Sequence, residues 1–238
     1  MSTLANIVRS IGQAGLFSFA VLRASKPTRD FFAELVREIY KIGARSLPII
    51  AVGGAFVGLS VILLGYRALD TYGASNQVSV MLGLGLYREL APVLTALLFI
   101  GRAGSSIAAE LGLMAIDPVA KVVAPRFWAA VICVPLLTAF FISFAILAGW
   151  FEAVRVIGLD DGTFWQAMKD AVDLGDDFLG AFIKAGVFGA IAALVAAYVG
   201  FHSEPTIEGT SVATTRAVVN ASLLVLMFNF VLSALMFR

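Results

Sequence analysis

Charged residues are scarce in this chain. Only 14% of its 238 residues are Asp, Glu, Lys or Arg, whereas 60% are hydrophobic. Soluble domains carry about a quarter charged residues, so this composition excludes an ordinary soluble domain and indicates a membrane protein. The net charge of +1 gives no reason to expect a nucleic-acid partner. The length suits one membrane domain without a separate soluble catalytic domain.

Cysteine and histidine each occur once. Cys133 has no second cysteine in the chain with which to form a disulfide, and His202 alone cannot build a histidine-based metal or catalytic centre. The G-x-x-x-x-G-K-[ST] loop that cradles ATP phosphates is absent, as are the H-E-x-x-H and G-x-S-x-G motifs of hydrolases. We therefore expect no metal site, no catalytic residue and no ATPase site in this chain.

Long apolar runs are abundant instead, and a helix needs about 20 such residues to cross a bilayer. The fourth run is short unless Lys184 extends its side chain to the interface. In the first run, Gly54 and Gly58 have the spacing that lets two helices pack closely. We predict an all-α polytopic membrane protein whose residues 46–238 form a five-helix transmembrane permease domain. The five runs are 46–66, 78–100, 127–150, 185–201 and 217–237.

Residues 1–45 are expected to form interfacial amphipathic helices. We interpret residues 1–25 as an uncleaved helix, because Arg23 and Lys26 follow its apolar run where a cleaved signal peptide has small neutral residues. Residues 28–44 repeat apolar side chains at spacings of three and four, with charges at most other positions. Such a helix suits the plane of the membrane interface, and packing on a soluble partner is the alternative.

The placement of Lys and Arg predicts the orientation in the membrane. Residues 1–45 are rich in Lys and Arg, and three more lie within 102–126, whereas 151–177 is rich in Asp. Cytoplasmic loops carry an excess of Lys and Arg. The N-terminus is therefore expected in the cytoplasm, and five spans place the C-terminus on the other side.

Arg88 and Glu89 are adjacent charges inside the second apolar run. A charge at the bilayer centre costs about 2.5–3.5 kcal/mol on insertion scales, so such residues normally face a bundle interior or a wet cavity. Pro92 lacks the N–H that would bond the Arg88 carbonyl, so the helix is expected to kink or break there. This pattern predicts a functional site; an ion pair that only holds helices together is the alternative.

Three stretches with further motifs resemble the MlaE-type permease family. LYRELAPVLTALL spans 86–98, GRAGS spans 101–105 and AELGLM spans 109–114. Asp117-Pro118, Pro125-Arg126 and the run 213–216 also fit the family pattern. The resemblance extends from the amphipathic N-terminus to the last run. It implies an interfacial helix followed by five transmembrane helices.

The resemblance also implies a function and partners. MlaE-type proteins are permease subunits of ABC transporters that move phospholipids between the inner and outer membranes and maintain outer-membrane lipid asymmetry. The implied assembly is a homodimer with ABC ATPase subunits that hold ATP and Mg²⁺, a periplasmic ring of MCE-domain lipid-binding subunits and a small STAS-domain protein. The implied location is the Gram-negative inner membrane, with a cytoplasmic N-terminus and a periplasmic C-terminus.

Candidate site residues follow from the buried charges together with the resemblance. Arg88 is expected to attract a lipid phosphate or to pair with Glu89 of its own or another subunit. Apolar contacts to the acyl chains are expected from Val61, Leu69 and Tyr72. The region that couples to the ATPase is expected to be flanked by Glu110, Asp117 and Pro118, and Glu110 as a solvated surface charge is the alternative.

Two rival functions belong to other classes. An ion-coupled secondary transporter needs a coupling-ion site and usually has inverted repeats, whereas the halves of this chain show no repeat and five spans do not divide evenly. A structural membrane subunit would not need charges inside a span. Copurification with an ATPase discriminates between them, because only the permease requires one.

One segment departs from the family pattern. The family carries additional residues before Asp117-Pro118, including a Thr-Glu-Gln run on a cytoplasmic coupling helix, whereas here Met114 is followed directly by Ala115. Either the segment is deleted, or it is missing only from the sequence as determined. We favour the second interpretation, because a permease without this helix would be uncoupled from ATP hydrolysis.

Mass spectrometry of the intact chain tests this interpretation. The sequence as it stands corresponds to 25.2 kDa, and we expect a larger measured mass. A measured mass of 25.2 kDa would show that the segment is deleted.

Overall fold

The computed structural model describes residue 12 and residues 15–25, 29–104, 123–173, 175–204 and 206–236. Within these residues every regular element is a helix, which confirms the predicted all-α polytopic class. Five helical stretches are long and apolar enough to cross a membrane, and a shorter apolar helix, Gly15–Ala24, precedes them. The five are Phe31–Asp70, Ser75–Arg102, Ala124–Ile157, Asp176–Phe201 and Glu208–Met236.

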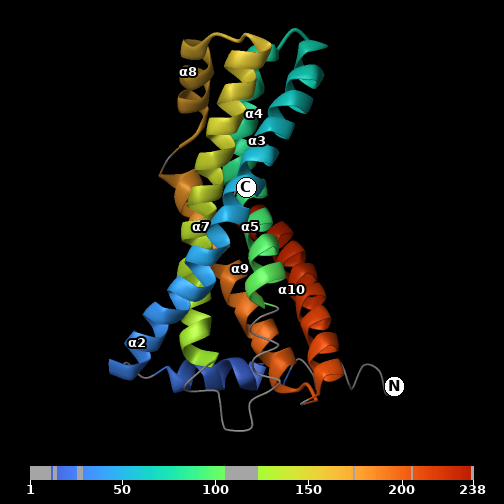
Figure 1. Cartoon of the computed structure of the whole chain (residues 1–238). Helices are drawn as coiled ribbons and strands as arrows, with labels where there is room; N and C mark the ends of the chain where they lie inside the picture. Colours follow the sequence, from blue (N-terminus) through green and yellow to red (C-terminus); the bar gives the residue numbers. More distant parts are fainter. Residues whose placement is uncertain are drawn as a thin grey trace.

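The first span is longer than predicted because the amphipathic segment runs directly into it. Figure 1 shows α2 rising obliquely toward α3, while the helix at the blue end of the colour bar lies across the lower end of the molecule. The sequence boundary at residue 45 therefore falls inside a continuous helical rod. Its elements are α2 (Arg29–Glu38), the π-helix η1 (Ile39–Gly43), the 3₁₀-helix η2 (Ala44–Ser46) and α3 (Leu47–Asp70).

The second and third spans also change helix type along their length. The second comprises η3 (Ser75–Gln77), α4 (Val78–Gly85), the π-helix η4 (Leu86–Leu90), α5 (Ala91–Phe99) and the π-helix η5 (Ile100–Gly104). The third comprises α7 (Ala124–Trp150) and the π-helix η7 (Phe151–Ile157). In this order they bring residues 86–90 to the middle of the second span.

A short helix, α8 (Asp161–Ala171), lies at the end of the molecule opposite the N-terminal helix (Figure 1). Asp160 caps it by accepting hydrogen bonds from the Thr163 N–H at 2.8 Å and the Thr163 hydroxyl at 2.9 Å. These bonds favour the ionised carboxylate and hold the pKa of Asp160 below its ordinary value. The helix α8 therefore begins at an acidic cap.

The fourth span corrects one prediction. Helix α9 (Asp176–Phe201) begins nine residues before the predicted start at 185, because Asp176 and Asp177 favour the first turn of a helix. Lys184 consequently lies inside α9 with a side chain that is fully buried, so the expected extension to the interface is wrong. Helix α10 (Ile207–Met236) returns antiparallel to α9, and both lie in the lower half of Figure 1.

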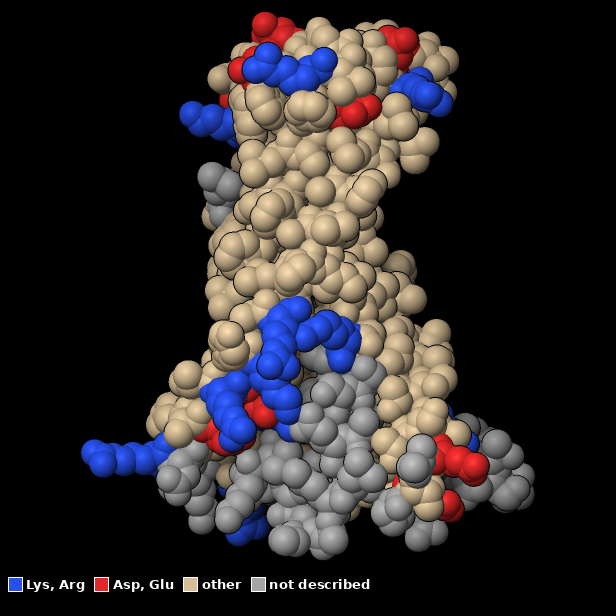
Figure 2. Space-filling view, viewed as in Figure 1, with Lys and Arg blue, Asp and Glu red and all other residues tan. Residues whose placement is uncertain are grey.

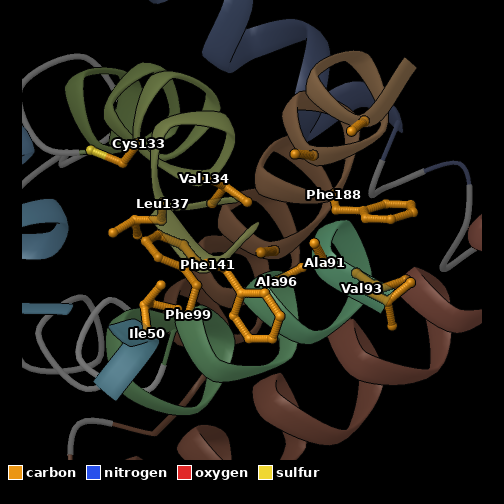
Figure 3. Packing of buried hydrophobic residues seen from close by; sticks show 14 of the residues in the cluster. Ile50, Ala91, Val93, Ala96, Phe99, Cys133, Val134, Leu137, Phe141 and Phe188 are labelled. Atoms are coloured by element: carbon orange, nitrogen blue, oxygen red, sulfur yellow. The ribbon is translucent and has the colours of Figure 1, made fainter. Parts of the chain in front are cut away.

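Helix α7 is the centre of the packing. Figure 3 shows its Val134, Leu137 and Phe141 between side chains of α5 and α9. On another side α7 packs against α3 with almost no space between the backbones. A Cβ added at Gly54 would lie 2.6 Å from the Phe141 carbonyl oxygen, and one added at Gly58 would overlap the Ala145 carbonyl oxygen. The predicted small-residue contact is therefore the α3–α7 interface.

The outer surface is divided by charge. Figure 2 shows Lys, Arg, Asp and Glu near both ends of the visible face, with a band free of them in between. Large apolar side chains are exposed on α3 and α10, including Phe56, Leu64, Leu223 and Phe230. Because an aqueous surface rarely carries so much apolar area, this band fits contact with lipid.

Replacing Gly58 with alanine should destabilise the protein by about 1–3 kcal/mol, because the backbone of α7 must move to admit a methyl group. Thermal unfolding in detergent measures this loss. The matched control is Gly186→Ala, where the added Cβ meets Pro135 at an ordinary 3.8 Å. Equal melting temperatures for the two variants would contradict the close contact.

Candidate functional site

The π-helix η4 holds both predicted charges, Arg88 and Glu89, and it ends beside Pro92 of α5. The expected break in the helix is replaced by a π turn, in which the Ala91 N–H donates to the carbonyl of Leu86. Pro92 still cannot donate to the carbonyl of Arg88. The Lys184 ammonium donates to that carbonyl instead, at 2.5 Å. The predicted backbone acceptor is present, and a lysine from α9 satisfies it.

Arg88 forms an ion pair with Asp177 of α9. Its Nε donates to Asp177 Oδ1 at 2.8 Å, while Asp177 Oδ2 accepts from the Asp173 N–H at 3.0 Å. The Asp177 side chain is 2% exposed and that of Arg88 is 41% exposed. The carboxylate is thus enclosed by protein, whereas the guanidinium keeps part of its surface open.

Glu89 forms the second ion pair, with Lys184 of α9 at 3.5 Å. Two residues of α10 complete its surroundings: Asn229 Nδ2 donates to Glu89 Oε2 at 2.8 Å, and Lys184 Nζ donates to Ser233 Oγ at 2.6 Å. The Lys184 side chain is 0% exposed and that of Glu89 is 46% exposed. Lys184 is therefore enclosed by protein, as Asp177 is, whereas Glu89 remains accessible, as Arg88 does.

These six side chains form what we call the ionic cluster. It joins η4, α9 and α10 where α9 begins and α10 ends, because Asp177 is in the first turn of α9 and Ser233 is in the last turn of α10. Its four charges sum to zero. Arg88 and Glu89 each find a partner on α9, because adjacent residues on a helix point about 100° apart. The members are Arg88, Glu89, Asp177, Lys184, Asn229 and Ser233.

Four members of the ionic cluster were missed by the sequence analysis. The apolar run that predicts the fourth span begins at 185, which leaves Asp177 in a loop and Lys184 at a span boundary. Their separation of seven residues is two helical turns, which places both on one face of a helix. Asn229 and Ser233 share a face by the same argument. This spacing was the available signal.

The other predicted site residues lie elsewhere. Val61 and Leu69 are half-buried on α3, and Tyr72 is exposed just after its end. None of these three makes a hydrogen bond or ring contact with the ionic cluster within the part of the chain that the structure describes. Glu110, Asp117 and Pro118 lie outside the described residues.

Comparisons with known proteins identify the family. A sequence model with the description "Permease MlaE" matches residues 35–235. The chain belongs to the MlaE permease family. The intermembrane phospholipid transport system permease protein MlaE of Haemophilus influenzae is 42% identical, over 96% of this chain and 92% of its own length.

Two further relatives match at lower identity. A probable ABC transporter permease protein of Rickettsia bellii is 30% identical over 98% of this chain and 94% of its own length. The chloroplastic protein TRIGALACTOSYLDIACYLGLYCEROL 1 of Arabidopsis thaliana is 27% identical over 85% of this chain and 61% of its own length. The Haemophilus alignment has 241 positions but includes only 96% of the 238 residues here, so about a dozen of its positions have no counterpart in this chain.

Replacing Lys184 with methionine should destabilise the protein by about 1–3 kcal/mol, because Glu89 and the Arg88 carbonyl then lose a donor. The double variant Lys184→Met/Glu89→Gln should recover part of this loss, since no carboxylate is left unpaired. Equilibrium unfolding in detergent measures Lys184→Met, Glu89→Gln and the double variant. A double variant less stable than the sum of the two single changes would contradict the pairing.

Proposed function

We propose that this chain is the permease subunit of an ABC transporter that moves phospholipids between the inner and outer membranes and so maintains outer-membrane lipid asymmetry. The observation that carries the proposal is the ionic cluster, a neutral set of charges among apolar helices with one cation and one anion partly open. Membership of the MlaE family and the Haemophilus relative support the same activity.

The open side chains match the polar part of a phospholipid. Arg88 presents a planar guanidinium, which binds phosphate oxygens through two parallel hydrogen bonds. Asp177 pairs with that guanidinium, so an arriving phosphate competes with a carboxylate that is already in place. Glu89 can accept hydrogen bonds from a head-group amine. A zwitterionic head group therefore engages both open side chains without adding net charge to the site.

The acyl chains need an apolar surface on the protein. Val61 and Leu69 on α3, with Tyr72 just beyond its end, provide exposed or half-buried apolar groups along one helix. Val61 and Tyr72 are eleven residues apart, which is about 16 Å along a helix and comparable to an extended acyl chain. We assign these residues to the acyl chains on that basis.

ATP hydrolysis belongs to a separate subunit in this proposal. The chain forms a homodimer in the inner membrane, with its N-terminus in the cytoplasm and its C-terminus in the periplasm. Glu110, Asp117 and Pro118 flank the contact with the ABC ATPase, which holds ATP and Mg²⁺. An MCE-domain ring receives or delivers lipid on the periplasmic side, and a small STAS-domain protein completes the complex.

Changing Arg88 to alanine should lower ATP-dependent phospholipid transfer about tenfold while leaving the complex assembled, because a charge-assisted contact to the phosphate is lost. Transfer of fluorescent phospholipid between reconstituted vesicles measures the effect. Arg67→Ala, an exposed cation at the end of α3, serves as the control and should transfer lipid normally.

Two outcomes would contradict this assignment. Normal transfer by an assembled Arg88→Ala complex would remove Arg88 from the lipid path, and dissociation of the complex would show that the ion pair only holds helices together. Transfer that proceeds without any ATPase subunit would favour the ion-coupled carrier instead.

A further inference from the structure

The two residues that flank the connection between the second and third spans contact the same short stretch of the chain. Arg102, at the end of the second span, donates from Nη1 to Ser46 Oγ at 2.6 Å. Arg126, in the first turn of α7, pairs through Nε with Glu38 Oε2 at 3.1 Å. We call residues Glu38–Ser46 the elbow stretch. Both ends of the connection are therefore tied to the elbow stretch.

The two ties differ in how firmly they hold. Glu38 and Arg126 are both buried, and a second contact joins Arg126 Nη2 to Glu38 Oε1 at 3.4 Å. Separating two enclosed opposite charges is costly, even though Lys41 Nζ also lies 4.0 Å from Glu38 Oε1, so the Glu38–Arg126 pair resists extension. Ser46 accepts from Arg102 while donating to the Ile42 carbonyl at 2.7 Å, which links the second tie to the backbone of the elbow stretch.

The elbow stretch is also where the first span departs from α-helical geometry. It contains the π-helix η1 followed by the 3₁₀-helix η2, between α2 and α3. A wide π-helical turn next to a narrow 3₁₀ turn is a typical place for a helix to bend. Gly43 allows α7 to sit directly against it, because a Cβ there would lie 2.7 Å from Cys133 Sγ. The rod can bend here while its contact with α7 is kept.

We propose that the elbow stretch is the hinge through which movement of the cytoplasmic connection reaches α3, with Arg126 and Arg102 as its positioning residues. This inference rests on the proposed function, because it assumes that an ATPase moves that connection. When the start of α7 shifts, the buried Glu38–Arg126 pair moves the elbow stretch with it. The bend then changes the tilt of α3, the helix to which we assign the acyl-chain contacts.

The double variant Glu38→Met/Arg126→Met tests the hinge. Replacing a buried ion pair by apolar residues of similar size is usually tolerated, so the fold and the complex should survive. With the ATPase bound in proteoliposomes, we expect ATP hydrolysis to continue while phospholipid moved per ATP falls about threefold or more. The control is Arg37→Met, because Arg37 is exposed and pairs only locally with Glu34 at 3.8 Å.

A distance measurement separates a hinge from a purely structural pair. Spin labels at Val36 of α2 and Phe56 of α3, both exposed, report the angle between the two helices. Trapping the complex with ATP and vanadate should change the label distance in the otherwise unaltered protein and leave it nearly constant in the double methionine variant.

Three results would overturn the inference. The first is unchanged lipid transfer per ATP in the double variant. The second is a distance between the labels that does not change on nucleotide trapping in the otherwise unaltered complex. The third is a parallel fall in hydrolysis and transfer, which would mean that the pair only stabilises the fold. If the unaltered complex moves no lipid with ATP, the proposed function fails, and the inference fails with it.

Discussion

The hydrogen bond from the Lys184 ammonium to the carbonyl of Arg88 is the contact on which the arrangement of η4, α9 and α10 depends. Enclosing a lysine in an apolar bundle costs several kcal/mol unless all its donors are used. Here the donors reach Glu89, Ser233 and the Arg88 carbonyl, to which Pro92 cannot donate. Pro92 withholds an N–H from this carbonyl and Lys184 supplies one from a neighbouring helix.

The protein uses ion pairs in two physically different ways. In the ionic cluster, Arg88 and Glu89 keep much of their surface open, so an incoming ligand can replace a partner at moderate cost. In the elbow stretch, Glu38 and Arg126 are both enclosed, so exchange would strand a charge. Burial alone distinguishes a pair that can be exchanged from a pair that holds two helices at a fixed distance.

Apolar run length and residue spacing predicted the five spans, the close contact at Gly54 and Gly58, and the unusual position of Arg88 and Glu89. The partners of those charges were not predictable in the same way. Arg88 meets Asp177 across 89 positions of sequence, and such a pairing depends on which helices become neighbours. The π turns are not predicted from the sequence, because a hydropathy pattern does not reveal one extra residue in a helical turn. Lys184 was misplaced because acidic residues in the first turn of α9 look like loop residues.

The contact between α3 and α7 limits how this protein can move. At Gly54 and Gly58 the backbone of α3 rests on carbonyl oxygens of α7, with no side chain between them that could change rotamer. Rotation of α3 about its own axis would drive neighbouring side chains into that backbone, because residues next to a glycine on a helix turn into the contact within about 100°. The two helices can therefore change their crossing angle about this contact, but α3 cannot twist against α7. Any rearrangement of the bundle around them proceeds by a change of angle and not by a twist of α3.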